Sequence, residues 1–123
     1  MTPGRLDELI ERFGRLRICI LGDFFLDEYL EIDAALAEPS LETGRTAHQV
    51  VRVRTSPGAA GTVVSNLAAL GAGAMHALGY TGDDGAGYDL ARGLGNLGCS
   101  TDRLFRVGGR VTPSYLKPRD AGV

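Results

Sequence analysis

Two carboxylates stand just beyond a short apolar segment, in a position suited to binding a ligand. The segment 17–21 reads Arg-Ile-Cys-Ile-Leu, and Asp23 and Asp27 follow it, four residues apart. In open α/β sheets, ligands gather at the carboxyl ends of such strands. A carboxylate such as Asp27 can accept hydrogen bonds from the vicinal hydroxyls of a polyol. The alternative interpretation is that both aspartates simply cap a turn.

A run of small residues forms the second candidate site. The segment 57–62 reads Pro-Gly-Ala-Ala-Gly-Thr and leads directly into an apolar helical pattern. Around Gly58 and Ala59, small side chains would let a ligand approach the backbone, where free N–H groups at a helix N-terminus favour hydroxyl or anionic oxygens. Tight packing of the helix on a sheet also requires small residues, so this alternative stays open.

Other patterns favour structural roles. The segment 82–85 (Gly-Asp-Asp-Gly) predicts an N-cap with a tight turn. The glycines of 93–98 match the spacing of a dinucleotide fingerprint, but they end a predicted helix, whereas that motif must follow a strand and open a helix. His48 and His76 are isolated, and His76, within an apolar strand, is expected to be a satisfied structural histidine. The sequence contains no Walker motif, no Gly-x-Ser-x-Gly and no zinc-ligand spacing.

The apolar periodicities predict strands and helices in alternation. The segment 17–21, which lacks polar alternation after its first residue, predicts a strand buried on both faces. The alternation at 29–33 and 49–54 predicts half-exposed strands, and 34–47 reads as a loop. The remaining predicted elements are helices at 4–14, 59–70 and 85–97, and strands at 74–80, 103–107 and 113–117.

This order predicts an α/β fold, with a mostly parallel, Rossmann-like sheet, flanking helices and a small β insertion after the first strand. The 123 residues suffice for one domain. A net charge of −2 provides no excess of positive charge that would indicate binding to nucleic acid or to an anionic membrane. No apolar run reaches the roughly 20 residues that a membrane span requires. Cys19 and Cys99 lack metal-type spacing; Cys19 is predicted to be a buried free thiol, which favours a cytoplasmic protein.

Taken in order, these segments resemble the start of the PfkB (ribokinase-like) carbohydrate kinases, and the bacterial heptose-phosphate kinase branch among them. The resemblance covers about residues 5–118. Three motifs carry it: 22–29 (Gly-Asp-Phe-Phe-Leu-Asp-Glu-Tyr), the glycine-rich signature at 57–72, and 79–87, which begins Gly-Tyr-Thr-Gly-Asp-Asp. Together, in this order and spacing, the three are far more specific than any one of them.

The resemblance implies both a layout and a set of site residues. The α/β core would comprise 1–28 and 56–123, and 29–55 would form a lid that closes over the sugar and pairs with a second subunit. Asp27 matches the carboxylate that binds sugar hydroxyls. Gly58 and Ala59 match a glycine pair that lets the sugar lie against a helix N-terminus.

Two substitutions depart from the family pattern. Ala59 stands where the second glycine usually is, and Thr62 stands where a sugar-binding asparagine usually is, so a hydroxyl replaces an amide. With Asp23 and Lys117, these residues complete the predicted substrate site. Lys117 and Arg119 could hold a substrate phosphate, or they could be solvated charges at a strand end.

The resemblance implies an ATP-dependent kinase that uses Mg²⁺ and phosphorylates a hydroxyl of a sugar or sugar phosphate. The Gly-Ala-Gly-Asp loop, which supplies the anion hole and the catalytic base in the family, is absent from these 123 residues. We therefore expect no catalytic residue, bound ATP or metal in this chain alone. The expected partners are a sugar or sugar phosphate, a second copy through the lid, or a C-terminal kinase portion. The alternatives are a non-catalytic sugar- or partner-binding module and an inactive gene fragment.

Overall fold

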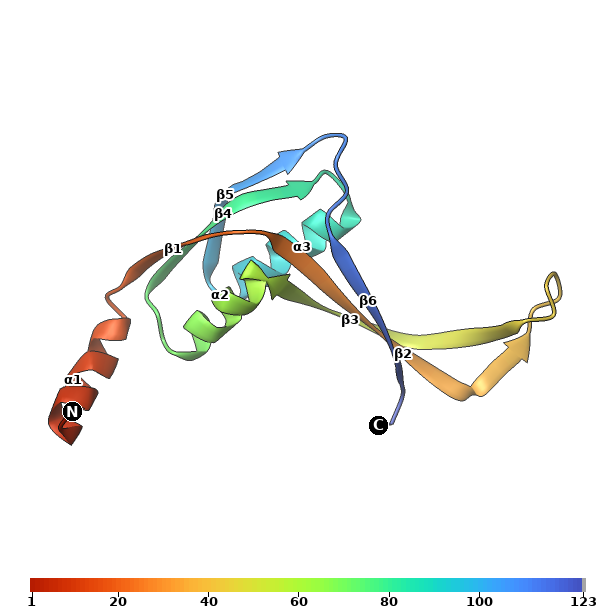
Figure 1. The fold of residues 1–123 in the computed structure, drawn as a ribbon, viewed down its shortest axis with the longest axis horizontal. Helices are drawn as coiled ribbons and strands as arrows, with labels where there is room; N and C mark the ends of the chain where they lie inside the picture. Colours follow the sequence, from red (N-terminus) through yellow and green to blue (C-terminus); the bar gives the residue numbers. More distant parts are fainter. Residues whose placement is uncertain (123) are drawn as a thin grey trace.

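The computed structural model describes residues 1–122, which form two three-stranded sheets and three helices (Figure 1). The predicted helices match the observed ones to within one residue at each end. Along the chain, the elements are α1 (Pro3–Phe13), β1 (Arg17–Leu21), β2 (Phe24–Pro39), β3 (Thr46–Ala59), α2 (Ala60–Ala69), β4 (Ala74–Gly82), α3 (Gly85–Asn96), β5 (Cys99–Val107) and β6 (Ser114–Asp120).

The first sheet, the core sheet, has the strand order β1-β4-β5, and its neighbouring strands are parallel. Parallel neighbours need crossover connections. Helix α3 supplies the crossover from β4 to β5, and α2 lies between the hairpin and β4. The predicted α/β fold, with a parallel sheet and flanking helices, is therefore confirmed.

The hydrophobic core lies between one face of this sheet and the helices α2 and α3. Alternate residues of each strand point to this face, because strand side chains alternate with a period of two. The first residues of β2 complete the same cluster before that strand leaves the core. The buried apolar residues are Ile20, Phe24, Leu26, Val64, Met75, Ala77, Leu90, Leu94 and Cys99.

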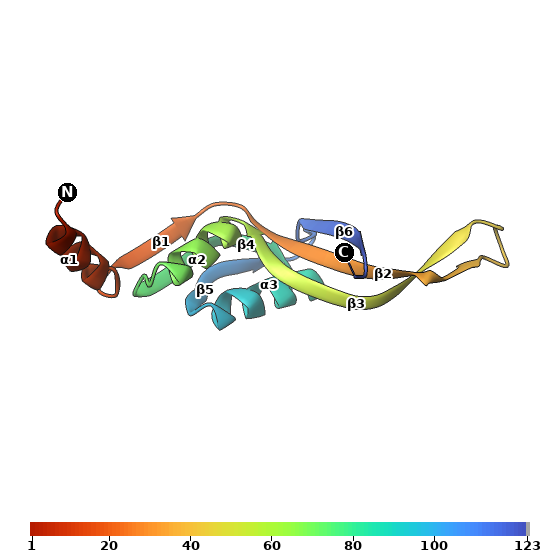
Figure 2. The ribbon, with the colours of Figure 1, turned by 90° about the horizontal axis from the view of Figure 1, so that it is seen from below.

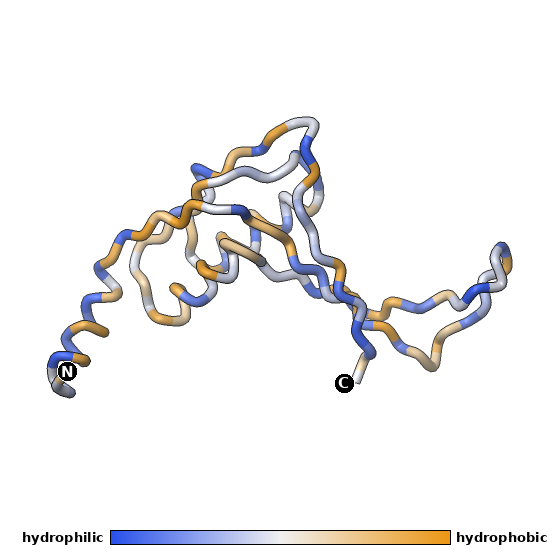
Figure 3. The backbone as a smooth tube through the Cα atoms, in the orientation of Figure 1, coloured by the Kyte–Doolittle hydropathy of each residue, from blue (hydrophilic) through white to orange (hydrophobic). Residues whose placement is uncertain are grey.

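The opposite face of the core sheet is bare, and two predictions about β1 are therefore wrong. Leu21 is 76% exposed and Cys19 is exposed, whereas both were predicted to be buried. The reason is that α2 and α3 cover one face only, and α1 buries no residue and extends away from the sheet (Figure 1). In Figure 3, β1 has the hydropathy of an interior strand, although no helix of residues 1–122 covers the face that carries Cys19 and Leu21. Cys99 is the buried thiol, and burial raises its pKa.

The second sheet, the lid sheet, has the order β3-β2-β6 and leaves the core as a long twisted arm (Figures 1 and 2). Strands β2 and β3 form an antiparallel hairpin, and β6 runs parallel to β2 on its other side. Strand β6 thus joins the sheet formed by the hairpin, although it lies outside 29–55, the segment predicted to form a lid.

The hairpin strands are longer than the alternating segments predicted. The predicted loop 34–47 belongs to the strands over 34–39 and 46–47, and within it Glu38 pairs with Ala47 and Pro39 with Thr46. Pro39, which reads as a turn residue in the sequence, is the last residue of β2. At the end of a strand, the hydrogen bond that proline cannot donate is not needed. None of the helices within residues 1–122 has the length and apolar character to cross a membrane.

Candidate functional site

Asp27 and Gly58 meet at the base of the lid hairpin. The antiparallel register sets Asp27 opposite Ser56 and Phe25 opposite Gly58, so the Asp27 side chain leans over the glycine. A Cβ atom on Gly58 would lie 2.8 Å from Oδ1 of Asp27 and 2.9 Å from its Cγ. Glycine is therefore required at this position if the carboxylate is to keep its place.

The start of α2 lies directly beside this contact. Ala59 is the N-cap of α2 and makes no side-chain capping hydrogen bond. The Ala60 amide donates to the main-chain carbonyl of Asp23 at 2.9 Å, which ties the helix start to the β1–β2 bend. Helix N-termini leave donors free for ligand oxygens and carry a partial positive charge. The carboxylate and the helix start thus offer acceptors and donors side by side.

Ala59 has an unusual backbone conformation, with φ 52° and ψ −118°. Among the described non-glycine residues, no other has a positive φ. Left-handed φ values suit glycine, because a Cβ atom there crowds the neighbouring carbonyl oxygen. The backbone thus retains a conformation typical of glycine at the position where alanine departs from the family pattern.

Lys117 on β6 occupies the free side of Asp27. Its Nζ lies 3.0 Å from Oδ2 of Asp27, and the Asp27 side chain is 18% exposed. The same ammonium lies 5.1 Å from the ring centroid of Tyr29. The hydrogen bond to Asp27 raises the pKa of Lys117 above its ordinary value. The contact was not foreseen, because nothing local to 113–117 shows that this strand pairs with β2.

The other predicted site residues lie near this point without contacting Asp27. Asp23 is exposed, and its main-chain carbonyl makes the contact with α2. Thr62 is exposed on the first turn of α2, and no hydrogen bond joins it to Asp27 in the described part of the chain. The structure therefore brings together Asp27, Gly58 and Lys117, with Ala59 adjacent.

A hydrogen-bonded cluster fixes the loop that leads to β6. The Asp84 carboxylate caps α3 by accepting from the Gly87 amide at 2.8 Å, as the sequence indicates. It also accepts from the Thr112 amide at 2.8 Å and from the Thr112 hydroxyl at 2.6 Å. The Gly82 amide donates to the same hydroxyl at 2.9 Å. Thr112 is 1% exposed and carries no sequence signal for this role.

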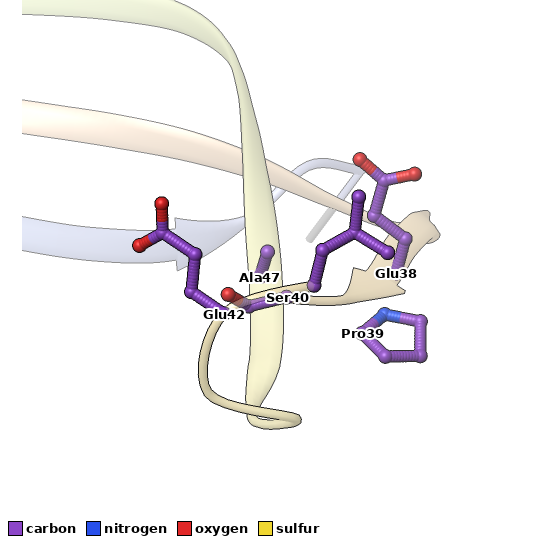
Figure 4. A pocket seen from close by; sticks show the side chains of 6 residues that line it. Glu38, Pro39, Ser40, Glu42 and Ala47 are labelled. Carbon is purple, nitrogen blue, oxygen red and sulfur yellow. The ribbon is translucent and has the colours of Figure 1, made fainter.

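Two hollows of the described surface lie away from this contact. One lies at the tip of the hairpin and is lined by Glu38, Glu42 and their neighbours (Figure 4). A smaller apolar one, of about 190 Å³, lies between α1, β1 and α2 and includes Phe13 and Leu67. Neither includes Asp27. The Asp27–Gly58 contact therefore lies outside both hollows, and residues 1–122 contain no group of three His, Cys, Asp or Glu side chains able to hold a metal ion.

The comparisons with known proteins agree with this architecture. No protein-family profile matches the chain. The bifunctional protein HldE of Mesorhizobium japonicum is 33% identical over 113 residues, which are 92% of this chain and 22% of that protein. The D-beta-D-heptose 7-phosphate kinase of Bordetella bronchiseptica is 33% identical over 114 residues, covering 91% of this chain and 34% of the kinase.

A solved structure shows the same fold. The ribokinase of Arabidopsis thaliana, determined with ribose and ATP, superposes with a TM-score of 0.62 at 20% identity. The match covers 86% of this chain and 33% of that ribokinase. The chain therefore spans about a fifth to a third of the length of the proteins it matches.

Proposed function

We propose that this chain forms the N-terminal, sugar-binding portion of an ATP-dependent carbohydrate kinase. The proposal starts from the finding that the chain belongs with the heptose-phosphate kinases of the ribokinase-like (PfkB) family. The complete kinase would transfer a phosphoryl group to a hydroxyl of a sugar or sugar phosphate. The observation that carries the proposal is the position of the Asp27 carboxylate, which lies against Gly58 at the start of α2, at the root of the hairpin.

The chemistry of this contact suits a polyol. The Asp27 carboxylate has acceptor sites for two sugar hydroxyls, and the ion pair with Lys117 orients it. The absence of side chains at Gly58 leaves room for a sugar to approach the backbone, where amides of α2 can donate to ring or hydroxyl oxygens. The hairpin would close over the bound sugar and exclude water from the phosphoryl donor.

Neither of the two hollows described above suits the nucleotide. The hairpin-tip hollow is lined by Glu38 and Glu42, which would repel a triphosphate, and the other hollow is apolar. ATP and Mg²⁺ would therefore be held by another part of the complete kinase. On this proposal the chain alone binds a sugar without phosphorylating it. The second candidate function, a non-catalytic sugar- or partner-binding module, is favoured by the same one-sided site.

A homodimer through the lid is part of the proposal. The face of the lid sheet that lies opposite Asp27 carries exposed apolar side chains beside Glu28 and Thr55: Val50, Val53 and Leu116 are 45%, 54% and 61% exposed. Burying such a face against a second copy would remove apolar area from water. We also place the protein in the cytoplasm, because Cys19 and Cys99 are unpaired and a reducing compartment keeps thiols free.

Calorimetric titration with D-β-D-heptose 7-phosphate tests the sugar site. The Asp27→Asn variant keeps the shape of the side chain beside Gly58 but loses its charge. We expect it to weaken binding by about 10-fold or more, because hydrogen bonds to charged groups contribute more than neutral ones. The matched control is Asp102→Asn, an exposed carboxylate on β5, which should bind as the wild type does.

The outcome that contradicts the proposal is defined by the same titration. If neither the heptose phosphate nor any other sugar or sugar phosphate in a panel binds the wild-type chain, the sugar site is wrong. If Asp27→Asn binds as tightly as the wild type, the site lies elsewhere. ATP-dependent turnover by the isolated chain, measured with a coupled ADP assay, would contradict the division of labour proposed for the complete kinase.

A further inference from the structure

Strand β6 brings Lys117 to Asp27, and it reaches the lid sheet through a short connection that contains glycine. This connection, residues 108–113, joins β5 to β6 and belongs to no helix or strand. It includes Gly108 and Gly109, and Gly109 has a φ of 76°, a conformation that side chains rarely adopt. Because glycine leaves the backbone free to turn, contacts with the rest of the chain must fix where β6 starts.

Thr112 anchors this connection to the core. Its hydroxyl donates to Oδ1 of Asp84 at 2.6 Å and accepts from the Gly82 amide at 2.9 Å. Its own amide donates to Oδ2 of Asp84 at 2.8 Å. Thr112 is 1% exposed, and a Cβ atom on Gly82 would lie only 2.8 Å from the Thr112 nitrogen. Three hydrogen bonds in tightly packed surroundings therefore hold Thr112 at the start of α3.

A single further hydrogen bond joins the anchored segment to the residue before Asp27. The carbonyl of Pro113 accepts from the Leu26 amide at 2.9 Å, and Leu26 directly precedes Asp27. Proline fixes its own φ and restricts the residue before it, so the backbone between Thr112 and this carbonyl has little freedom. Leu26 is 1% exposed and belongs to the hydrophobic core. The hydrogen bond therefore joins two fixed segments and sets the position of β6 on β2.

The register that follows from this anchor decides which side chain of β6 meets Asp27. In the observed register, Lys117 lies opposite Tyr29, on the face of the sheet that Asp27 shares. Successive strand residues point to opposite faces, so a slip of one residue would place Leu116 on this face and turn Lys117 to the other. The contact of 3.0 Å between Lys117 and Asp27 therefore depends on where β6 starts.

We propose that Asp84 and Thr112 are positioning residues for the sugar site, because they hold the start of β6 so that Lys117 faces Asp27 and orients its carboxylate. This inference rests on the proposed function and adds to it two residues that do not touch the sugar. Capping of α3 requires only the hydrogen bond that Asp84 accepts from the Gly87 amide. The other two come from Thr112, which is 28 residues away, and these hold β6.

The position of Lys117 can be measured without a ligand, because it is the only lysine in the chain. Mass spectrometry follows the rate at which acetic anhydride acetylates Lys117, with the N-terminal amine as internal reference. Only an unprotonated amine is nucleophilic, and the hydrogen bond to Asp27 raises the pKa of Lys117, so the ion pair slows the reaction. Asp27→Asn removes the carboxylate charge and defines the rate without the ion pair.

The variants separate the anchoring of β6 from a role in stability alone. Thr112→Val keeps the shape of the side chain but loses the hydroxyl, so its Lys117 should react nearly as fast as that of Asp27→Asn. Thr112→Ser keeps the hydroxyl and should react as the wild type does. Asp84→Asn can still cap α3, but its amide nitrogen cannot accept from the Thr112 amide, so its rate should rise as well. The matched control is Thr101→Val on β5, which should react as the wild type does. Circular dichroism verifies that each variant is folded.

Calorimetry with D-β-D-heptose 7-phosphate connects the position of Lys117 to the sugar. Thr112→Val should bind about 5-fold more weakly than the wild type, because a carboxylate that Lys117 no longer orients must be ordered on binding. Thr112→Ser and Thr101→Val should keep the wild-type affinity. In a Lys117→Met background, Thr112→Val should weaken binding no further, because residues that act through one contact are not additive.

Each contrary outcome has a distinct meaning. Folded Thr112→Val and Asp84→Asn chains whose Lys117 reacts at the wild-type rate overturn the positioning role. A rise in Thr112→Ser equal to that in Thr112→Val overturns it too, because the hydroxyl is then not what holds β6. Faster acetylation with unchanged sugar affinity refutes the connection to the sugar site. If no sugar binds the wild type while the Lys117 rates follow the prediction, the proposed function fails and the anchoring of β6 stands.

Discussion

At the scale of single residues, Ala59 carries the sharpest conflict between side chain and backbone. Its φ of 52° places a Cβ atom where glycine is preferred, and it stands beside the Asp27–Gly58 contact. Such conformations cost on the order of 1–3 kcal/mol and persist only where the surroundings impose them. Here the surroundings are the Ala60 amide, tied to the Asp23 carbonyl, and the paired end of β3. The strain lies at the proposed ligand contact.

We predict that Ala59→Gly stabilises the protein. Glycine adopts the observed φ without strain, and the greater freedom of glycine in the unfolded chain offsets part of this gain. The net increase in the free energy of unfolding should be about 1 kcal/mol, measured by urea denaturation. The control is Ala91→Gly in the middle of α3, where glycine lacks this benefit and should cost about 1 kcal/mol. Destabilisation by both substitutions would show that the φ of Ala59 is not strained.

At the scale of elements, the Asp84–Thr112 cluster joins the core sheet to the lid sheet. Asp84 caps α3 in the core, and Thr112 lies just before β6, which carries Lys117 into the lid. The hydrogen bonds from the Thr112 hydroxyl, the Thr112 amide and the Gly87 amide lower the pKa of Asp84 below its ordinary value of 3.8. A carboxylate whose pKa is lower in the folded state stabilises that state above its unfolded pKa.

We predict a corresponding dependence of stability on pH. The contribution of Asp84 should be fully present above pH 3.8 and lost as pH falls through its lower folded pKa. Asp84→Asn should therefore lower the urea midpoint at neutral pH, and the gap to the wild type should narrow in acid. The control, Asp102→Asn, should shift the midpoint little at either pH. A gap for Asp84→Asn that stays constant from neutral pH to acid would mean that its charge is not what stabilises the loop.

The same scale shows what sequence patterns can and cannot predict. The helices, the core strands and the Asp84 cap follow from local periodicity and turn chemistry, and all appear at or near their predicted positions. The length of the hairpin does not follow from local periodicity, because the pairing of Glu38 with Ala47 stabilises as strands two segments whose sequence is typical of a loop. The proximity of Asp27 to Gly58 is predicted by the family resemblance and not by local sequence patterns. Lys117 belongs to the predicted site, but its ion pair with Asp27 could not be predicted, because β6 pairs with β2, a strand far away in the sequence.

At the scale of the whole molecule, apolar surface is exposed in two separate places. On the core sheet, Leu21 is 76% and Phe105 54% exposed, on the face that no helix covers. On the lid, Val53 and Leu116 are 54% and 61% exposed. Contiguous apolar surface of this kind marks interaction sites in soluble proteins. The two surfaces lie on different sheets, so substitutions can address each one separately.

We predict that the lid, and not the core sheet, mediates self-association. The lid strands carry the proposed sugar site on a charged face and exposed apolar side chains on the other, which leaves the second face free for a second copy in a twofold arrangement. Val53→Asp, at a position already open to solvent, would place a charge in that interface and should weaken the dimer at least 10-fold. Leu21→Asp makes the same change on the core sheet and should leave the dimer intact. Sedimentation velocity over a range of concentrations measures both, with circular dichroism to verify the fold. A wild-type chain that stays monomeric at every concentration would refute the lid dimer, and dissociation by Leu21→Asp alone would assign the association to the uncovered face of the core sheet.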